Sequence, residues 1–150
     1  MNRRTFLKAS AVSAPMIVSA QALGLEGPGA NDTINIRLIG LGGRCKEMAR
    51  TCYPIPGLRI AAISDCFEPR IDAWMREMPE GQSWTPYIDF REMIEKENLD
   101  GVMVETTTHA RAWVTCHAMA MGMDAFIEKP MALTIAEGRE MVDCARKYGR

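Results

Sequence analysis

Residues 39–45 read Ile39-Gly40-Leu41-Gly42-Gly43-Arg44-Cys45, and the segments on either side of them decide the fold. The apolar run 34–39 leads into this stretch and predicts a strand, whereas the segment from Gly43 to about Cys52 predicts a helix. A glycine-rich turn that joins a strand directly to a helix is typical of the first half of a βαβ unit.

The glycines of this turn predict a phosphate site. Gly40 permits the tight turn, and Gly42 lets a pyrophosphate approach the backbone without a side chain in the way. The N–H groups that begin the helix, at Gly43 and Arg44, then face the negative charge. Cys45 takes the third glycine position of the G-x-G-x-x-G pattern, where it affects helix packing more than phosphate binding. The alternative is an ordinary glycine-rich turn.

The rest of the chain repeats the alternation of strand and helix. Strands are predicted at residues 34–39, 58–64, 84–87, 100–105 and 124–127. Helices are predicted at residues 43–52, 68–78, 109–121, from the N-cap Asp89 to about Asn98, and from the N-cap Thr134 to about Lys147. This order predicts an α/β fold: a doubly wound parallel sheet of the Rossmann type, with helices on both faces.

Asp65 follows the second predicted strand, about 20 residues beyond the glycine-rich turn. An acid at this place hydrogen-bonds the adenosine ribose hydroxyls of NAD. A 2′-phosphate would meet like charge, so Asp65 favours NAD over NADP, although Arg70 lies close in the sequence and keeps NADP open. The alternative is that Asp65 caps the helix beginning near Glu68 and Pro69.

Two further polar groups follow later strands. Thr106-Thr107-Thr108-His109 ends the fourth strand, and Glu128-Lys129-Pro130 ends the fifth. Because doubly wound sheets bind ligands at the carboxyl ends of their strands, these groups should meet the glycine turn and Asp65 at one edge. The candidate cofactor-binding residues among them are Thr106, Thr107, His109 and Glu128.

The helix 109–121 carries an apolar stripe at helical spacing. Its members are Ala110, Val114, His117, Ala118 and Met121. We therefore expect His117 to be a core residue with satisfied hydrogen bonds rather than a ligand.

The first 22 residues predict a signal peptide. Residues 2–8, Asn-Arg-Arg-Thr-Phe-Leu-Lys, resemble the twin-arginine pattern, and Ala20-Gln21-Ala22 offers a small-x-small cleavage site after an alanine- and serine-rich stretch. Pro15 and the absence of any acid argue against the alternative, an amphipathic helix. Residues 23–33 read as a linker and residues 34–150 as the globular domain. We expect export by the Tat route to the periplasm or the exterior.

Composition and charge exclude several classes of function. Beyond the signal, 15 basic residues face 19 acidic ones, a net charge of −4 that offers no footprint for nucleic acid or an anionic membrane. The apolar part of the signal is too short to span a bilayer, and no other segment is long and apolar enough. Five cysteines without a C-x-x-C pair predict small core residues rather than a metal site.

The segment 128–134, Glu-Lys-Pro-Met-Ala-Leu-Thr, resembles the E-K-P-x-A-x-T signature of the Gfo/Idh/MocA family, the glucose–fructose oxidoreductase and inositol dehydrogenase group. The glycine-rich turn, Tyr87-x-Asp89-Phe90, Asp100-Gly101-Val102 and His109 recur at that family's intervals, so the resemblance covers residues 34–150. It implies a Rossmann domain that binds NAD in an oxidoreductase acting on sugars, polyols or related compounds.

The same resemblance assigns roles. It implies that Lys129 is catalytic and orients or polarises the hydroxyl or carbonyl of the substrate beside the nicotinamide. It also implies that Glu128 contacts the nicotinamide ribose or positions the lysine, the alternative being a salt bridge between Glu128 and Lys129. The chain departs from the family's Thr-Pro-x-His-x-His pattern, with Thr107 in place of the proline and Arg111 in place of the second histidine.

Members of this family are more than twice as long, with a second α/β domain that covers the substrate and supplies a catalytic histidine. We expect this chain to be a fragment that ends before that domain and is inactive alone, its parent being a candidate homo-oligomer. Two other functions stay open: an NAD-dependent glycoside hydrolase of the same superfamily, and a non-catalytic dinucleotide-binding module. The tripeptide Glu128-Lys129-Pro130 favours the oxidoreductase.

Overall fold

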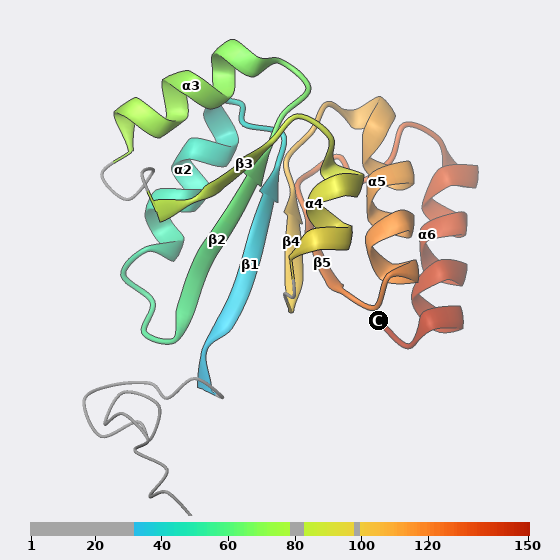
Figure 1. Ribbon diagram of the computed structural model, residues 1–150. Helices are drawn as coiled ribbons and strands as arrows, with labels where there is room; N and C mark the ends of the chain where they lie inside the picture. The colour runs from blue at the N-terminus through green and yellow to red at the C-terminus, as the bar shows by residue number, and fades with distance from the viewer. Residues whose placement is uncertain (1–31, 79–82, 98–99) are drawn as a thin grey trace, which may run out of the picture. The chain divides into compact units, whose positions relative to one another are not determined.

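The computed structural model describes residues 32–78, 83–97 and 100–150, and in this part the strands form one parallel sheet (Figure 1). The order across the sheet is β3-β2-β1-β4-β5. The strands are β1 (Ile34–Ile39), β2 (Leu58–Ser64), β3 (Thr85–Tyr87), β4 (Gly101–Val104) and β5 (Asp124–Ile127). The predicted doubly wound parallel sheet is confirmed, whereas the predicted signal (1–22) and nearly all of the linker (23–33) lie outside the described residues.

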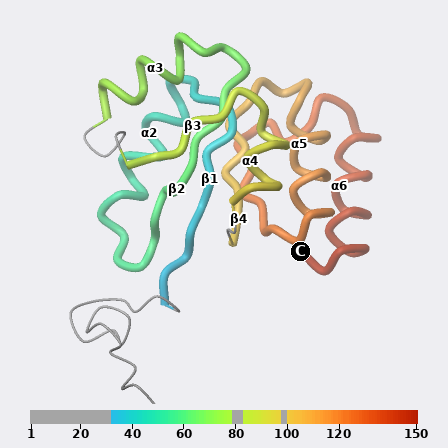
Figure 2. Tube along the Cα trace, viewed as in Figure 1, coloured from blue at the N-terminus to red at the C-terminus, as the bar shows by residue number. Residues whose placement is uncertain are grey.

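Helices alternate with the strands and cover both faces of the sheet. They are α2 (Gly43–Cys52), α3 (Glu68–Glu77), α4 (Phe90–Lys96), α5 (Thr108–Ala120) and α6 (Ile135–Tyr148). Helices α2 and α3 pack on one face, α4 and α5 on the other, and α6 lies along α5 (Figures 1 and 2). The chain moves outward from β1 to β3 and then returns to β4, so the strand order reverses between β1 and β4. Ligands of doubly wound sheets bind at this crossover.

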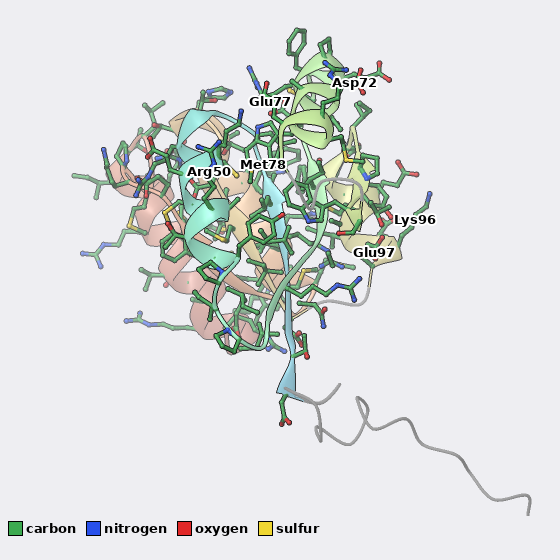
Figure 3. All side chains as sticks on the ribbon, turned by 90° about the vertical axis from the view of Figure 1, so that its left-hand side faces the viewer. Arg50, Asp72, Glu77, Met78, Lys96 and Glu97 are labelled. Carbon is green, nitrogen blue, oxygen red and sulfur yellow. The ribbon has the colours of Figure 1, made fainter. Side chains whose placement is uncertain are left out.

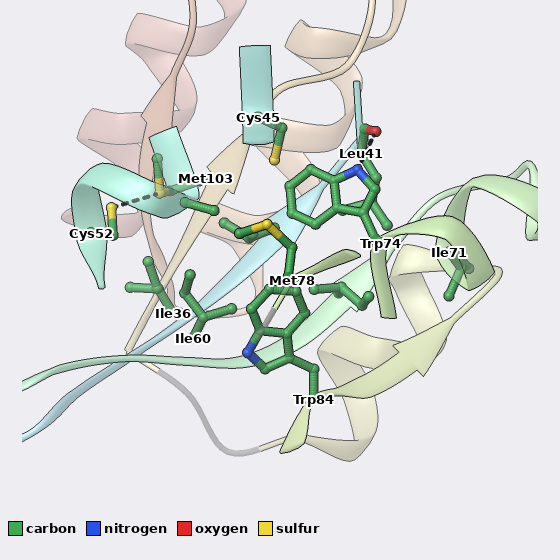
Figure 4. Close-up of a cluster of buried hydrophobic side chains, with 13 residues drawn as sticks. Ile36, Leu41, Cys45, Cys52, Ile60, Ile71, Trp74, Met78, Trp84 and Met103 are labelled. Carbon is green, nitrogen blue, oxygen red and sulfur yellow. Dashed lines mark hydrogen bonds between the residues drawn. The ribbon is translucent and has the colours of Figure 1, made fainter. Parts of the chain in front are cut away.

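The core under α2 and α3 holds the glycine-rich turn in place (Figure 4). The indole N–H of Trp74 donates a 2.8 Å hydrogen bond to the carbonyl of Leu41, which ties α3 to the turn. Cys45, at the third glycine position, is 1% exposed and packs in this cluster, as does the buried Cys52. The expectation of core cysteines is confirmed for these two and wrong for Cys66, which is exposed in the loop after β2.

Charged side chains cover the outer surface of the same two helices. Figure 3 looks onto this surface and labels Arg50 on α2 and Asp72 and Glu77 on α3. Lys46 pairs with Glu77, so one ion pair joins the two helices across their exposed sides. Of the described helices, none combines the length and apolarity that crossing a membrane requires.

One charged side chain lies inside the fold, at a position that no sequence pattern distinguished. Arg37 of β1 is fully buried and donates to the backbone carbonyl of Glu97 and, at 2.6 Å, to the sulfur of Met123. Burial lowers the pKa of this guanidinium, and the nearby Glu97 opposes that change. The Tyr87 hydroxyl donates to the Glu97 carboxylate at 2.8 Å, so these groups join β1, β3 and the end of α4.

Two predicted N-caps are confirmed. The Asp89 carboxylate accepts from the N–H of Arg91 at 2.9 Å, and Thr134 forms a capping box with Glu137. Helix α4 ends at Lys96, slightly before the expected end near Asn98, a residue outside the described part.

The predicted stripe on α5 is partly wrong. Met121 is 50% exposed, and His117 is half-buried, edge-on to the ring of Phe90, with no hydrogen-bond partner for its Nε2 among the described residues. Because α5 is packed between the sheet and α6, its buried surface includes polar positions such as Thr115 that a single apolar stripe does not predict.

Candidate functional site

The glycine-rich turn contains two glycines that are required for different reasons. Gly40 has a φ of +89°, and a Cβ there would lie 2.7 Å from the backbone nitrogen of Thr106, so only glycine fits between β1 and the end of β4. A Cβ at Gly42 would meet nothing within 4 Å. The first bond of α2 runs from the N–H of Lys46 to the carbonyl of Gly42, which leaves the N–H groups of the first turn directed outward. This open helix start suits a pyrophosphate.

A cleft of about 560 Å³ opens beside this turn, within the usual range for small-molecule sites of roughly 300–1,000 Å³. Five predicted site residues line it: Gly40, Gly42, Asp65, Thr106 and Thr107. They come from the ends of β1, β2 and β4, so the expectation that strand-end groups meet at one edge holds for these residues.

An aromatic surface in the same cleft was not predicted. Trp113 of α5 is 56% exposed, stands edge-to-face with Phe90 at 4.9 Å between ring centroids, and has the Arg91 guanidinium 5.9 Å from its ring. A flat, exposed aromatic ring suits stacking of a planar base. The sequence offered one sign, the single tryptophan of α5, but it did not show which residues surround that ring.

Asp65 lies at the end of β2 and is 6% exposed. Its carboxylate accepts from the N–H of Leu41 at 2.8 Å and from the Arg70 guanidinium at 2.9 and 3.1 Å. The N-cap of α3 is Phe67, so the alternative role of Asp65 as the cap of that helix is wrong. The Asp65 carboxylate does accept a 2.9 Å hydrogen bond from the N–H of Phe67. Asp65 therefore links the glycine-rich turn to the β2 side of the cleft and holds the Arg70 guanidinium there by hydrogen bonds.

On the β5 side, Glu128 is buried and pairs with Arg44 of α2 at 3.1 Å. The alternative, a salt bridge between Glu128 and Lys129, is wrong about the partner, because the carboxylate turns toward α2. Lys129 follows with an exposed side chain. The Arg44–Glu128 pair thus connects the start of α2 to the end of β5, next to the proposed catalytic lysine.

Arg111 holds the ends of two strands together. Its guanidinium donates to the carbonyls of Thr106 at 2.8 Å, Glu128 at 2.9 Å and Pro130 at 2.5 Å. The side chain is only 7% exposed. The sequence marked Arg111 as a departure from a histidine pattern, but its structural role depends on carbonyls that are 5 to 19 residues away.

Glu105, at the end of β4, was missed altogether. It is 8% exposed, lines the cleft, and neither of its carboxylate oxygens has a hydrogen-bond partner among the described residues. Burial raises its pKa, as does the nearby Glu128, while Arg44 and Arg111 oppose this rise. A glutamate directly after the apolar strand Gly101–Val104 was the available signal.

The remaining predicted residues lie at the same edge but do not line the cleft. Gly43, Arg44 and Lys129 are exposed, and the Nδ1 of the exposed His109 lies 3.1 Å from the Thr107 hydroxyl. Within residues 32–78, 83–97 and 100–150, no cluster of His, Cys, Asp or Glu has the arrangement of a metal site.

Solved structures share this fold. An oxidoreductase from Agrobacterium radiobacter in complex with NAD+, L-tartaric acid and magnesium aligns with a TM-score of 0.72 at 22% identity, covering 77% of this chain and 33% of that protein. The myo-inositol 2-dehydrogenase from Lactobacillus plantarum aligns with a TM-score of 0.69 at 26% identity, covering 77% of this chain and 34% of that one.

Curated relatives are similar at comparable distance. A glycosyl hydrolase family 109 protein from Shewanella pealeana is 26% identical and is covered over 37% of its length by 98% of this chain. The chain thus spans about a third of the length of the curated relatives that it matches. The family model described as "Oxidoreductase family, NAD-binding Rossmann fold" matches residues 34–150. This chain therefore belongs to the Gfo/Idh/MocA oxidoreductase family and contains its NAD-binding Rossmann domain.

Proposed function

We propose that this chain is the cofactor half of an exported oxidoreductase that moves hydride between NAD and a sugar, a polyol or a related substrate. The observation that carries the proposal is the open helix start at Gly42, with Asp65 on its β2 side and the neighbouring residues Glu128 and Lys129 on its β5 side. A dinucleotide laid across a doubly wound sheet needs a phosphate site between its two nucleoside sites, and the order of these residues along the edge supports that arrangement.

The adenosine half would lie on the β2 side. Asp65 would accept from the ribose hydroxyls, and Trp113 would offer its exposed ring to the base. Because the Asp65 charge opposes a 2′-phosphate, NAD should bind better than NADP. Arg70 is committed to Asp65 by two hydrogen bonds, which reduces its capacity to attract that phosphate.

The nicotinamide half would lie toward β5. Nicotinamide accepts or donates a hydride when bound, and the residues of this chain bind and orient it. Lys129, exposed next to the buried Glu128, would hold or move a proton at the hydroxyl or carbonyl oxygen of the substrate. Arg111 fixes the backbone on both sides of Lys129, through the carbonyls of Glu128 and Pro130.

Titration of the 150-residue chain with NAD+ and NADP+ by calorimetry tests the binding assignment. We expect tighter binding of NAD+, and Asp65→Asn should reduce that preference by roughly 10- to 150-fold, the value of one charge-assisted hydrogen bond. Asp72→Asn, an exposed carboxylate on α3, is the matched control and should leave the preference unchanged. Equal affinities in the unsubstituted chain would overturn the role of Asp65.

The complete protein, we propose, continues into a substrate domain and follows the Tat route. The relatives, of which this chain covers 37%, support the first point, and the twin arginines support the second. Replacing Arg3 and Arg4 with lysine should stop export in a Tat-competent host, and an exported double variant would contradict the targeting.

A second candidate is an NAD-dependent glycoside hydrolase, favoured by the glycosyl hydrolase family 109 relatives. The two functions differ in their products. An oxidoreductase accumulates reduced cofactor with turnover, whereas a hydrolase that oxidises its substrate only transiently releases sugar without net NADH. Absorbance at the NADH band during turnover of the full-length protein separates them.

A further inference from the structure

Glu105 is the buried charge at this edge that the fold itself leaves unsatisfied. Asp65 and Glu128 are equally buried, but each is paired with an arginine. Glu105 has no hydrogen-bond partner for either oxygen among the described residues. A buried carboxylate without partners is costly, and such groups persist where a ligand or a proton completes them.

The charges around Glu105 come from three elements. Glu128, directly after β5, repels it, whereas Arg44 of α2 and Arg111 of α5 attract it. The thiols of Cys45 and Cys52 of α2 are the other titratable groups close enough to interact with it. Both arginines are already engaged, Arg44 with Glu47 and Glu128 and Arg111 with three carbonyls. The carboxylate of Glu105 thus faces positive groups that are held by other acceptors.

The position of Glu105 in the sheet lies on the side where we expect the nicotinamide half of the dinucleotide to bind. β4 lies between β1 and β5, on the opposite side of the glycine-rich turn from β2 and Asp65. If adenosine occupies the Asp65 side, the nicotinamide crosses the ends of β4 and β5, where Glu105 and Glu128 lie. The oxidised ring carries a positive charge, and the reduced ring carries none.

Resting on the proposed binding of NAD, we propose that Glu105 places an unpaired negative charge beside the nicotinamide and thereby favours NAD+ over NADH. The bound cation supplies the partner that the fold lacks. Because burial and Glu128 raise the pKa of Glu105, binding of NAD+ should displace a proton that binding of NADH does not. The preference for NAD+ should therefore increase as pH rises above the ordinary carboxyl range.

The test compares the dissociation constants of NAD+ and NADH in the 150-residue chain and in Glu105→Gln, measured by calorimetry across a pH series. Glutamine keeps the shape and removes the charge. We expect the ratio of NAD+ to NADH affinity to fall about tenfold at pH 8 in Glu105→Gln, and its dependence on pH to flatten. Glu105→Asp, which keeps the charge, should retain most of the ratio. Asp143→Asn, an exposed carboxylate on α6, controls for net charge.

The outcomes separate the two proposals. A ratio that stays within twofold in Glu105→Gln overturns the inference, whether both cofactors weaken together or neither changes. If Glu105→Gln does not fold, the pH series on the unsubstituted chain decides, and a ratio that does not rise with pH overturns the inference. If the unsubstituted chain binds neither cofactor, the proposed function itself fails.

Discussion

Gly40 and Gly42 show that one residue type meets two different demands within three positions. Gly40 is required by the fold, because its left-handed backbone and the nearby Thr106 nitrogen leave no room for a Cβ. Gly42 has an ordinary φ of −73° and open space above it, so the fold tolerates a side chain there. In the proposed function, the requirement at Gly42 comes from the pyrophosphate of the cofactor.

Substitutions at the two positions should therefore separate stability from binding. Gly40→Ala should lower the free energy of unfolding by at least about 1–3 kcal/mol, since a left-handed backbone with a side chain carries that strain before the clash is counted. Gly42→Val should leave stability within about 1 kcal/mol and abolish NAD+ binding. Urea denaturation and calorimetric titration of both variants measure the two effects. Normal NAD+ affinity in Gly42→Val would contradict the phosphate site.

Glu105 should make stability depend on pH in the direction opposite to a paired carboxylate. Because its pKa is raised in the folded state, the native protein binds more protons than the unfolded chain above the ordinary carboxyl pKa, and stability falls as pH rises through the raised value. Glu105→Gln should raise the unfolding free energy at pH 8 and leave it nearly unchanged at pH 4. Thermal melts at both values test this, and stabilisation at pH 4 alone would contradict it.

At the scale of elements, the sequence predicted those features whose signals are local. The limits of β1, β2 and β5 and the N-caps at Asp89 and Thr134 depend on residues within one turn or one strand. The contacts of Arg111, the partner of Glu128 and the burial of Arg37 depend on segments far along the chain, so no local pattern shows them. The sequence therefore predicted which strand ends contribute residues to the site. It did not predict which of those side chains form hydrogen bonds or ion pairs with one another.

Among the contacts between elements, those of Arg111 should cost the most unfolding free energy when they are lost. It satisfies three carbonyls at the ends of β4 and β5, and Arg111→Met would leave them without this donor inside the fold. We expect a loss of about 3 kcal/mol in unfolding free energy, the range for breaking charged hydrogen bonds to buried groups. Arg111→Lys should recover only part, because one ammonium replaces a planar fork. Arg146→Met on the exposed side of α6 is the control, and an equal loss there would argue against the assignment.

At the scale of the whole molecule, the β5 side of the sheet leaves large apolar side chains exposed. β5 pairs with β4 alone within the described part, and Phe126 of this strand is 50% exposed. Leu133 and Ile135, which follow β5 in the chain, are 65% and 85% exposed. An uncovered edge strand with apolar neighbours promotes association.

The 150-residue chain should consequently self-associate as its concentration rises. A double change, Phe126→Lys with Ile135→Glu, should reduce that association while leaving the unfolding free energy within about 0.5 kcal/mol, because both side chains are exposed. Sedimentation at several concentrations measures it. A monomer at every concentration of the unsubstituted chain would contradict the expectation.

The two cores differ in how far apart their members lie along the chain, and this has a consequence for folding. All members of the α2–α3 cluster except Met103 lie between residues 36 and 84, whereas the cluster on the other face joins Ile39 to Met123. Contacts between near neighbours close shorter loops and form sooner. During refolding, Trp74 and Trp84 should therefore become buried before Trp113 meets Phe90. The intrinsic fluorescence of the protein would then register a half-assembled domain whose nucleotide cleft does not yet exist.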